Sequence, residues 1–156
     1  MNKPVYMEEA AQLSLDNIQS GEGEPFGAVI VKDGIIIARG NNRVTSTNDP
    51  TAHAEVVAIR EACHVLGSFQ LEGCDIYSSC EPCPMCLGAI YWFRLDRIYY
   101  ANTRQDAANI GFDDALLYQE RAKPLAQRML PIEHIANEKA LSAFQLWQTR
   151  QNKISY

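Results

Sequence analysis

The stretch from residue 51 to residue 93 constrains this chain most, because it carries two short segments that must meet in the fold. The first is His53-Ala54-Glu55, and the second is Pro82-Cys83-Pro84-Met85-Cys86. One imidazole and two thiolates suit Zn²⁺, and three protein ligands leave a fourth tetrahedral position for water, as in catalytic zinc sites. We therefore expect zinc to be bound by the side chains of His53, Cys83 and Cys86.

A carboxylate lies next to this expected metal site, because Glu55 follows His53 by two residues. Thiolates donate charge to the metal, so zinc with two of them acidifies a bound water less than an all-imidazole site does. A nearby base must then take the proton and deliver it to a ring nitrogen and to a leaving amine. We expect Glu55 to be this catalytic group in a hydrolytic deamination.

Two other interpretations of the cysteines stay open. A Cys-x-x-Cys pair can be a redox motif, and Cys80 offers a third thiol that would complete a closed structural zinc site. The second alternative predicts a non-enzymatic interaction domain that loses zinc when Cys80 is replaced. Neither gives Glu55 a task, whereas H-x-E…P-C-x-x-C is the pattern of zinc nucleobase deaminases, so we favour the catalytic interpretation.

The length of 156 residues predicts a single domain, 1–156, able to bury a core. Hydrophobic residues make up 47% and charged residues 21%, which is typical of soluble globular proteins. No apolar run approaches the roughly 18 residues needed to span a bilayer, and the N-terminus does not resemble a signal segment. We therefore expect a cytoplasmic protein without a membrane partner, in which Cys63, Cys74 and Cys80 are reduced thiols.

The charge distribution argues against a nucleic-acid partner. The formal net charge is −5, and the 14 basic residues are scattered along the chain. A protein that grips a polyanion needs clustered Lys and Arg side chains. A small-molecule partner is favoured instead.

Hydrophobic periodicity and turn residues predict an alternation of helices and strands. Asp33-Gly34 predicts a hairpin, Thr51 is the expected cap of the second helix, and the segments 41–50 and 102–114 are expected to be loops. The alternation implies a mixed sheet with helices on both faces. The expected helices are 4–20, 51–66, 84–93, 115–121 and 141–150, and the expected strands are 26–32, 35–40, 74–78, 97–101 and 129–135.

Several motifs resemble the cytidine-deaminase superfamily, and they cover nearly the whole chain. Those shared with the superfamily are Pro25–Val29, His53–Glu55 and Cys80–Ala89. Those that resemble the small bacterial guanine deaminases within it are Asn48–Thr51, Ala89–Trp92, Gly111–Asp114 and the final Tyr156. The resemblance implies an α/β fold, a three-layer α/β/α sandwich with a mixed five-stranded sheet. It also implies zinc-dependent conversion of guanine to xanthine and ammonia by a homodimer that can exchange a C-terminal tail, about residues 140–156.

The same resemblance implies roles for individual residues. Phe26 and Asn42 would hold the purine, and the backbone N–H of Ala54 would lie near its carbonyl edge. Trp92 is expected either in a pocket wall or in the core. Tyr156 would lie over the pocket as a lid that excludes water, although chain termini are usually disordered.

The acidic pair Asp113-Asp114 matches the chemistry of guanine. Guanine presents N1–H and the 2-amino group as paired donors, and a carboxylate is an acceptor-only partner for such an edge. We prefer Asp114 as the residue that recognises this edge. Two roles stay open for it: it either assists the last proton transfer or only binds the substrate. The alternative is that the pair caps the helix that follows.

A second enzymatic hypothesis keeps the same metal site with another substrate. The chain would then be a tRNA-specific adenosine deaminase or another cytidine or nucleobase deaminase. A tRNA substrate predicts tight, salt-dependent RNA binding.

Overall fold

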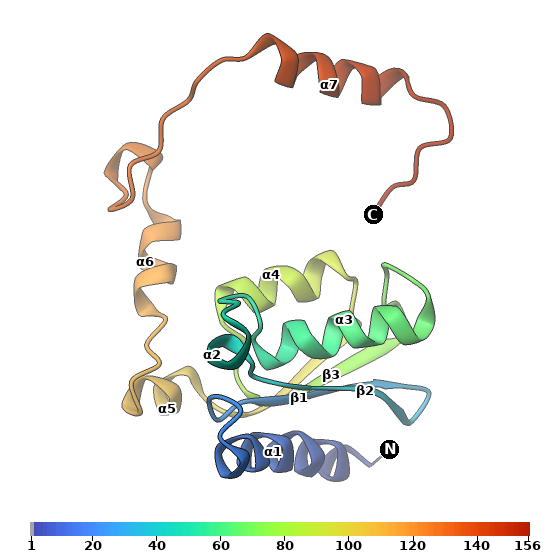
Figure 1. The fold of residues 1–156 in the computed structure, drawn as a ribbon, viewed down its shortest axis with the longest axis vertical. Coiled ribbons are helices and arrows are strands. Elements are labelled where there is room, and N and C mark those ends of the chain that lie inside the picture. Colours follow the sequence, from blue (N-terminus) through green and yellow to red (C-terminus); the bar gives the residue numbers. More distant parts are fainter. Residues whose placement is uncertain (1) are drawn as a thin grey trace. The chain divides into compact units, whose positions relative to one another are not determined.

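A four-stranded mixed sheet organises the first of two units in the computed structural model, which describes residues 2–156 (Figure 1). This unit ends at Ala115, and the second is Leu116–Tyr156. The strand order is β2-β1-β3-β4, with β1 antiparallel to both neighbours and β3 parallel to β4. The strands are β1 Gly27–Lys32, β2 Ile35–Asn41, β3 Cys74–Cys80 and β4 Arg97–Asn102.

Helices cover both faces of the sheet, as the sequence predicted. The helices of this unit are α1 Lys3–Ser20, α2 Val44–Thr47, α3 Ala54–Leu66, α4 Pro84–Trp92 and α5 Arg104–Asn109. Helix α1 lies on one face, and α3 and α4 lie on the other (Figure 1). The central strand β1 supplies both layers of the core, because successive side chains of a strand point to opposite faces: Val29 packs with Ala10 of α1, and Ile30 packs with Ile59 of α3.

The predicted turn between β1 and β2 is confirmed. Asp33 and Gly34 have φ values of 50° and 78°, the left-handed conformations that a tight two-residue hairpin turn requires. Gly67 also has a positive φ, 60°, and ends α3 with backbone bonds to Cys63 O and His64 O. Local turn and cap chemistry therefore places these boundaries where the sequence predicted them.

Four expectations about the elements were wrong. The sheet has four strands, since residues 129–135 form no strand, and an extended segment becomes one only by pairing with a neighbour. Thr51 does not cap α3; its hydroxyl bonds Asp49, and His53 is the N-cap residue. The two segments expected to be loops contain the short helices α2 and α5. The second of these is stabilised by a capping box between Thr103 and Asp106, which was not predicted.

The second unit consists of α6 Ala115–Ala122, which begins at its boundary, the 3₁₀ turn η1 Leu125–Gln127 and α7 Glu138–Thr149. Asn137 caps α7 by accepting a hydrogen bond from the backbone N–H of Ala140 at 3.0 Å. None of residues 116–156 is buried in the single chain. Packing within one copy therefore contributes little to the stability of this unit.

Two further observations bear on the composition. No helix within residues 2–156 combines the length and the apolar character needed to cross a membrane. The five cysteines are free thiols, including Cys63, Cys74 and Cys80, as expected.

Gly40 of β2 allows α3 to approach the sheet closely. A Cβ atom at this position would lie 2.2 Å from Ala54 O and 2.5 Å from Ala58 N, both backbone atoms of α3. We expect Gly40→Ala to lower the free energy of unfolding by about 1–3 kcal/mol, because a helix backbone cannot yield without moving the whole helix. Thermal and urea unfolding of the purified variant measure the effect.

Gly88→Ala in α4 is the matched control for this substitution. A Cβ at Gly88 would meet no heavy atom within 4 Å, and alanine is favoured over glycine inside a helix by about 0.5–1 kcal/mol. We expect the control to be neutral or slightly stabilising. Equal stability of the two variants would show that the contact between β2 and α3 is not tight.

Candidate metal centre and active site

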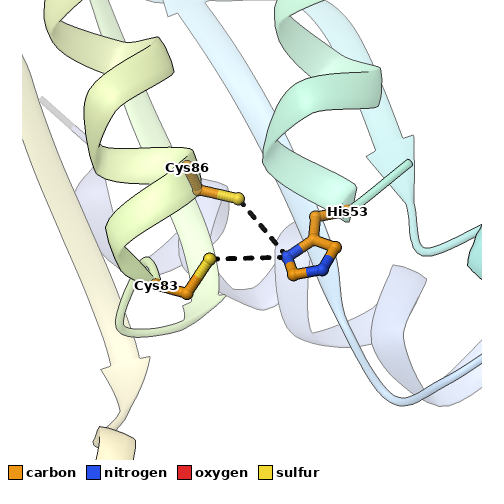
Figure 2. Close-up of side chains that lie close together, drawn as sticks. All are labelled: His53, Cys83 and Cys86. Atoms are coloured by element: carbon orange, nitrogen blue, oxygen red, sulfur yellow. Dashed lines mark hydrogen bonds between the residues drawn. The ribbon is translucent and has the colours of Figure 1, made fainter. Parts of the chain in front are cut away.

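The tips of two helices bring the candidate metal ligands together. His53 is the N-cap residue of α3 and Cys83 is the N-cap residue of α4, while Cys86 lies in the first turn of α4. Pro84 starts α4 without loss of a hydrogen bond, because the first helical N–H has no partner within the helix. Figure 2 shows the imidazole and both thiols pointing toward one another. Helix N-termini favour anionic groups, so both tips favour thiolates.

The spacing of the three ligand atoms fits a tetrahedral zinc ion. His53 Nδ1 lies 3.6 Å from Cys83 Sγ and 3.5 Å from Cys86 Sγ, and all three atoms lie within 4.8 Å of one another. Zinc bonds of about 2.3 Å to sulfur and about 2.0 Å to nitrogen, set at a tetrahedral angle, would separate such ligands by about 3.6 Å. The donor set and its spacing therefore fit zinc.

The pKa values of the two thiols are shifted in opposite directions. A hydrogen bond from Cys86, assisted by one from His53, lowers the pKa of Cys83 to about 4. The pKa of Cys86 is raised by that same bond and by burial. The pKa of His53 is raised chiefly by its hydrogen bond to Cys83, with smaller contributions from the negative charges of Glu55 and Glu24. A cation between these groups would favour the thiolate form of both cysteines.

Glu55 is almost fully buried beside the ligands, with 6% of its surface exposed. Its Oε1 accepts a hydrogen bond from Ser78 Oγ at 3.2 Å, and its Oε2 accepts one from Cys86 Sγ at 3.5 Å. Burial is the main reason that the pKa of this carboxyl group is raised. A raised pKa brings the carboxyl group closer to neutral pH, where a general acid–base works best.

Cys80 is not one of the three clustered ligands. Its thiol donates a hydrogen bond to Thr103 O at 3.7 Å, and burial raises its pKa to about 11. A neutral thiol bonded to a backbone carbonyl is a structural group, which argues against the closed four-ligand zinc site.

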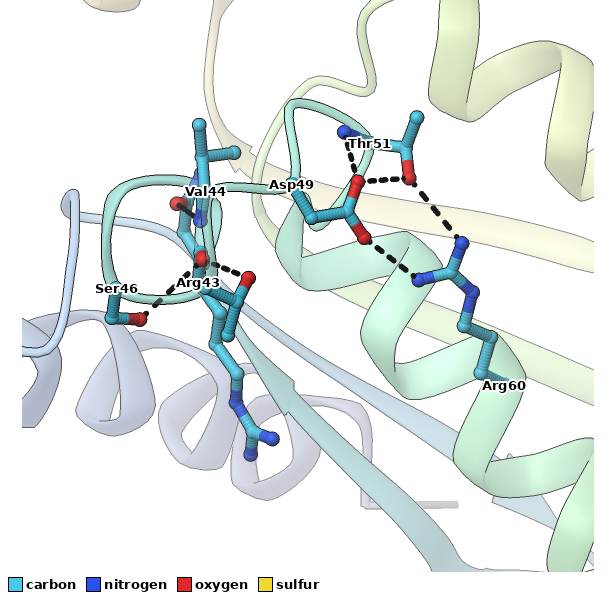
Figure 3. Close-up of polar contacts among 8 residues, drawn as sticks. Arg43, Val44, Ser46, Asp49, Thr51 and Arg60 are labelled. Carbon is cyan, nitrogen blue, oxygen red and sulfur yellow. Dashed lines mark hydrogen bonds and ion pairs between the residues drawn. The ribbon is translucent and has the colours of Figure 1, made fainter.

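The loop that leads to His53 is held by its own polar side chains (Figure 3). Asp49 accepts hydrogen bonds from the backbone and the hydroxyl group of Thr51 at 2.9 and 2.7 Å, and it forms a 3.4 Å ion pair with Arg60 of α3. The backbone N–H of Arg43 donates to Ala52 O at 2.9 Å. These contacts tie the start of the loop to its end and so fix the approach to the metal ligand.

Phe26 and Asn42, the expected purine contacts, lie side by side, because Asn42 N donates to Phe26 O at 3.1 Å. Phe26 is half-buried and packs edge-on against Phe112, with ring centroids 5.1 Å apart. Asn42 is buried, and its Oδ1 accepts a hydrogen bond from Val44 N at 3.0 Å. Its amide NH₂ therefore remains as the group suited to an acceptor on a ligand.

The two adjacent aspartates have different environments. Asp113 is exposed and accepts a hydrogen bond from Ala115 N at 2.8 Å, so it performs the helix-capping role that was the alternative for the pair. Asp114 is half-buried, and burial, with an added contribution from the negative charge of Cys83, raises its pKa. Asp114 therefore lies close enough to the metal ligands to sense their charge.

The remaining candidate residues differ in burial. Ala54 is fully buried at the start of α3, whereas Trp92 at the end of α4 is 62% exposed, which excludes the core as its position in the single chain. Tyr156 belongs to the second unit. Its role as a lid stays a prediction.

Sequence reasoning missed three polar residues near this site. Ser78 orients Glu55, Asn17 is a buried side chain bonded to the backbone near Phe26, and Glu24 contributes charge near His53. Ser78 had a usable signal, since it is a small polar residue inside an otherwise buried strand two positions before Cys80. No local pattern marks the other two.

Comparisons with known proteins agree with this geometry. The family model of the cytidine and deoxycytidylate deaminase zinc-binding region matches residues 1–102. A guanine deaminase of Bacillus subtilis is 53% identical over 156 residues, and the match covers all of both chains. An X-ray structure of guanine deaminase from the same organism has a TM-score of 0.97 and 52% sequence identity, and the match covers 100% of this chain and 99% of the chain in that structure. A tRNA-specific adenosine deaminase of Bacillus subtilis is 38% identical over 117 residues, which are 75% of this chain and 72% of the relative.

Proposed function

The chain belongs to the cytidine and deoxycytidylate deaminase family, and we propose that it is a zinc-dependent guanine deaminase that converts guanine to xanthine and ammonia. The observation that carries this proposal is the full-length similarity to a guanine deaminase, which includes the second unit. By contrast, the similarity to the tRNA-specific enzyme covers 75% of the chain. The net charge of −5 also favours a small purine base over a polyanion.

His53, Cys83 and Cys86 would hold the zinc ion, since their ligand atoms already have the spacing that the metal requires. When bound, zinc supplies Lewis-acid activation of the water that hydrolyses the substrate. The N-termini of the two helices that carry the ligands stabilise negative charge at this end of the pocket.

Glu55 carries the protons in the proposed mechanism. It takes a proton from the attacking water as the water oxygen bonds to C2 of guanine, and it gives this proton to N3. A second proton from the water oxygen then reaches the 2-amino nitrogen, the C2–N bond breaks, and ammonia leaves. Ser78 keeps the carboxyl group oriented through the bond to Oε1, so both transfers use one fixed position.

Asp114 would accept hydrogen bonds from N1–H and from the 2-amino group. Its neighbour is occupied in capping the next helix, and Asp114 itself lies near the charge of Cys83. Asp114 would select guanine whether or not it also carries the last proton. Adenine and cytosine lack this paired donor edge, so they could not form both hydrogen bonds.

The rest of the pocket follows from the same assignment. Phe26 would pack against the purine ring, the Asn42 amide would bond a ring nitrogen, and the backbone N–H of Ala54 would face the carbonyl edge. Trp92 would form a pocket wall, and Tyr156 would cover the base. The exposure of Trp92 in the single chain supports a position where it meets a ligand or another copy.

We propose further that two copies form a cytoplasmic homodimer that exchanges the tail of about residues 140–156, with 1–156 as one functional domain. The exposed apolar side chains of the second unit support this arrangement. Ile135, Phe144 and Leu146 expose 81%, 78% and 71% of their surfaces. Such a surface is stabilised when another chain covers it.

A panel of substrates tests the proposed activity. We expect zinc-loaded protein to release ammonia from guanine and to be at least about 100-fold slower with adenine, cytosine and cytidine, because a buried polar group left unpaired discriminates strongly. Ammonia release under initial-rate conditions is the measurement. Inactivity toward guanine combined with salt-sensitive tRNA binding would instead favour the tRNA-deaminase alternative.

A further inference from the structure

One carboxylate oxygen near the proposed purine contacts lacks a hydrogen-bond partner. Among the side chains of residues 2–156, Glu24 Oε2 is the buried oxygen or nitrogen atom for which no hydrogen bond is formed. Buried polar atoms are rarely left in this state, so each such atom needs an explanation, such as a role in catalysis or a bound water or ion. Glu24 is not among the residues assigned above to metal or substrate.

The backbone of Glu24 is hydrogen-bonded beside Phe26 and Asn42, the two proposed purine contacts. Asn17, which is 2% exposed, donates hydrogen bonds from Nδ2 to Glu24 O at 2.7 Å and to Asn42 O at 2.9 Å. Phe26 N also donates to Glu24 O, at 2.8 Å. The side chain of Glu24 therefore starts from a backbone position that is fixed next to both proposed purine contacts, Phe26 and Asn42.

The packing of the preceding residue confirms this close approach. A Cβ atom on Gly23 would lie 2.3 Å from Asn42 O and 3.1 Å from Asn17 Nδ2. Only glycine lets the segment lie this close to the end of β2.

We propose that Glu24 determines substrate specificity by accepting a hydrogen bond from the N–H of the imidazole ring of an unsubstituted purine. The inference rests on the proposed function and extends it. A carboxylate only accepts, so its partner must be a donor. Two donors of guanine, N1–H and the 2-amino group, face Asp114 in the proposed binding mode, and the five-membered ring supplies the remaining N–H.

This assignment explains how the site would select free bases. A sugar or methyl group on N9 leaves the five-membered ring without an N–H group, and the buried Oε2 of Glu24 would then have no donor. Nucleosides would be rejected by this loss as well as by their bulk. An acceptor that has no partner within the chain would therefore favour ligands that supply a donor at this position.

A comparison of guanine with 9-methylguanine tests the proposal. We expect Glu24→Ala to raise KM for guanine about 10- to 100-fold, because a charged hydrogen bond is lost, and to leave the KM for 9-methylguanine nearly unchanged. Glu24→Gln keeps a carbonyl acceptor and should recover part of the affinity for guanine. Glu22→Ala removes the same charge from an exposed side chain two residues away and is the matched control.

Zinc content, thermal stability and calorimetric binding of both bases are measured alongside the kinetics. Equal effects of Glu24→Ala on guanine and 9-methylguanine would overturn the proposal. Loss of zinc with an unchanged preference would also overturn it and would instead make Glu24 an outer partner of His53. If the unmodified protein releases no ammonia from guanine, the proposed function fails, and the calorimetric preference still decides the role of Glu24.

Discussion

A Glu55→Ala variant is expected to keep its zinc and to lose guanine turnover by about 10²–10⁴-fold, the range typical of a missing general acid–base. The carboxyl group is buried, is oriented by Ser78, and has a raised pKa, so no solvent-exposed group can take its place at the reacting water. The three metal ligands remain intact in this variant. Ammonia release and zinc content per chain, measured on the same preparation, separate catalysis from metal binding.

Glu61→Ala is the control for this prediction, because it removes an exposed carboxylate from the same helix. We expect it to retain both zinc and activity. A Glu55→Ala enzyme that works at a near-normal rate would eliminate the proposed mechanism. Loss of zinc from that variant would move Glu55 from proton transfer to support of the metal site.

A Cys86→Ala variant should lose both zinc and activity. Cys86 is fully buried and lies 3.5 Å from His53 Nδ1, and its removal leaves only two of the three clustered ligands. Replacement of groups that merely support a ligand typically weakens metal binding 10- to 100-fold, so loss of a ligand should cost more than about 100-fold. Competition with a chelator of known affinity measures the change, and thermal unfolding should show the lost stabilisation by bound metal.

Cys80→Ala provides the matched comparison, since it removes a buried thiol from a neighbouring position. Its bond to Thr103 O suggests a small effect on stability and none on zinc stoichiometry. Zinc loss in Cys80→Ala equal to that in Cys86→Ala would revive the closed structural site. If Cys80→Ala retains zinc and Cys86→Ala loses it, the result supports a site with an open fourth position.

Residue type and spacing predicted a cluster of chemically matched side chains. The meeting of His53, Cys83, Cys86 and Glu55 in the fold was predictable because ligand preference and proton chemistry belong to the side chains themselves. The hairpin at Asp33-Gly34 and the start of α4 at Pro84 were predictable because turn and cap preferences depend on a few adjacent residues.

Contacts between distant segments were decided only by the tertiary structure. The expected strand 129–135 had suitable residues but no neighbour to pair with, so the sheet has four strands. Asp113 and Asp114 are chemically identical, and only their positions assign one to a cap and leave the other near Cys83. The orientation of Glu55 by Ser78, 23 residues away, and the unpartnered oxygen of Glu24 depend on which segments meet in the core. A hydrogen bond depends on the positions of two atoms to within a fraction of an ångström. A ligand motif depends only on the chemical identity of its residues, which the sequence gives directly.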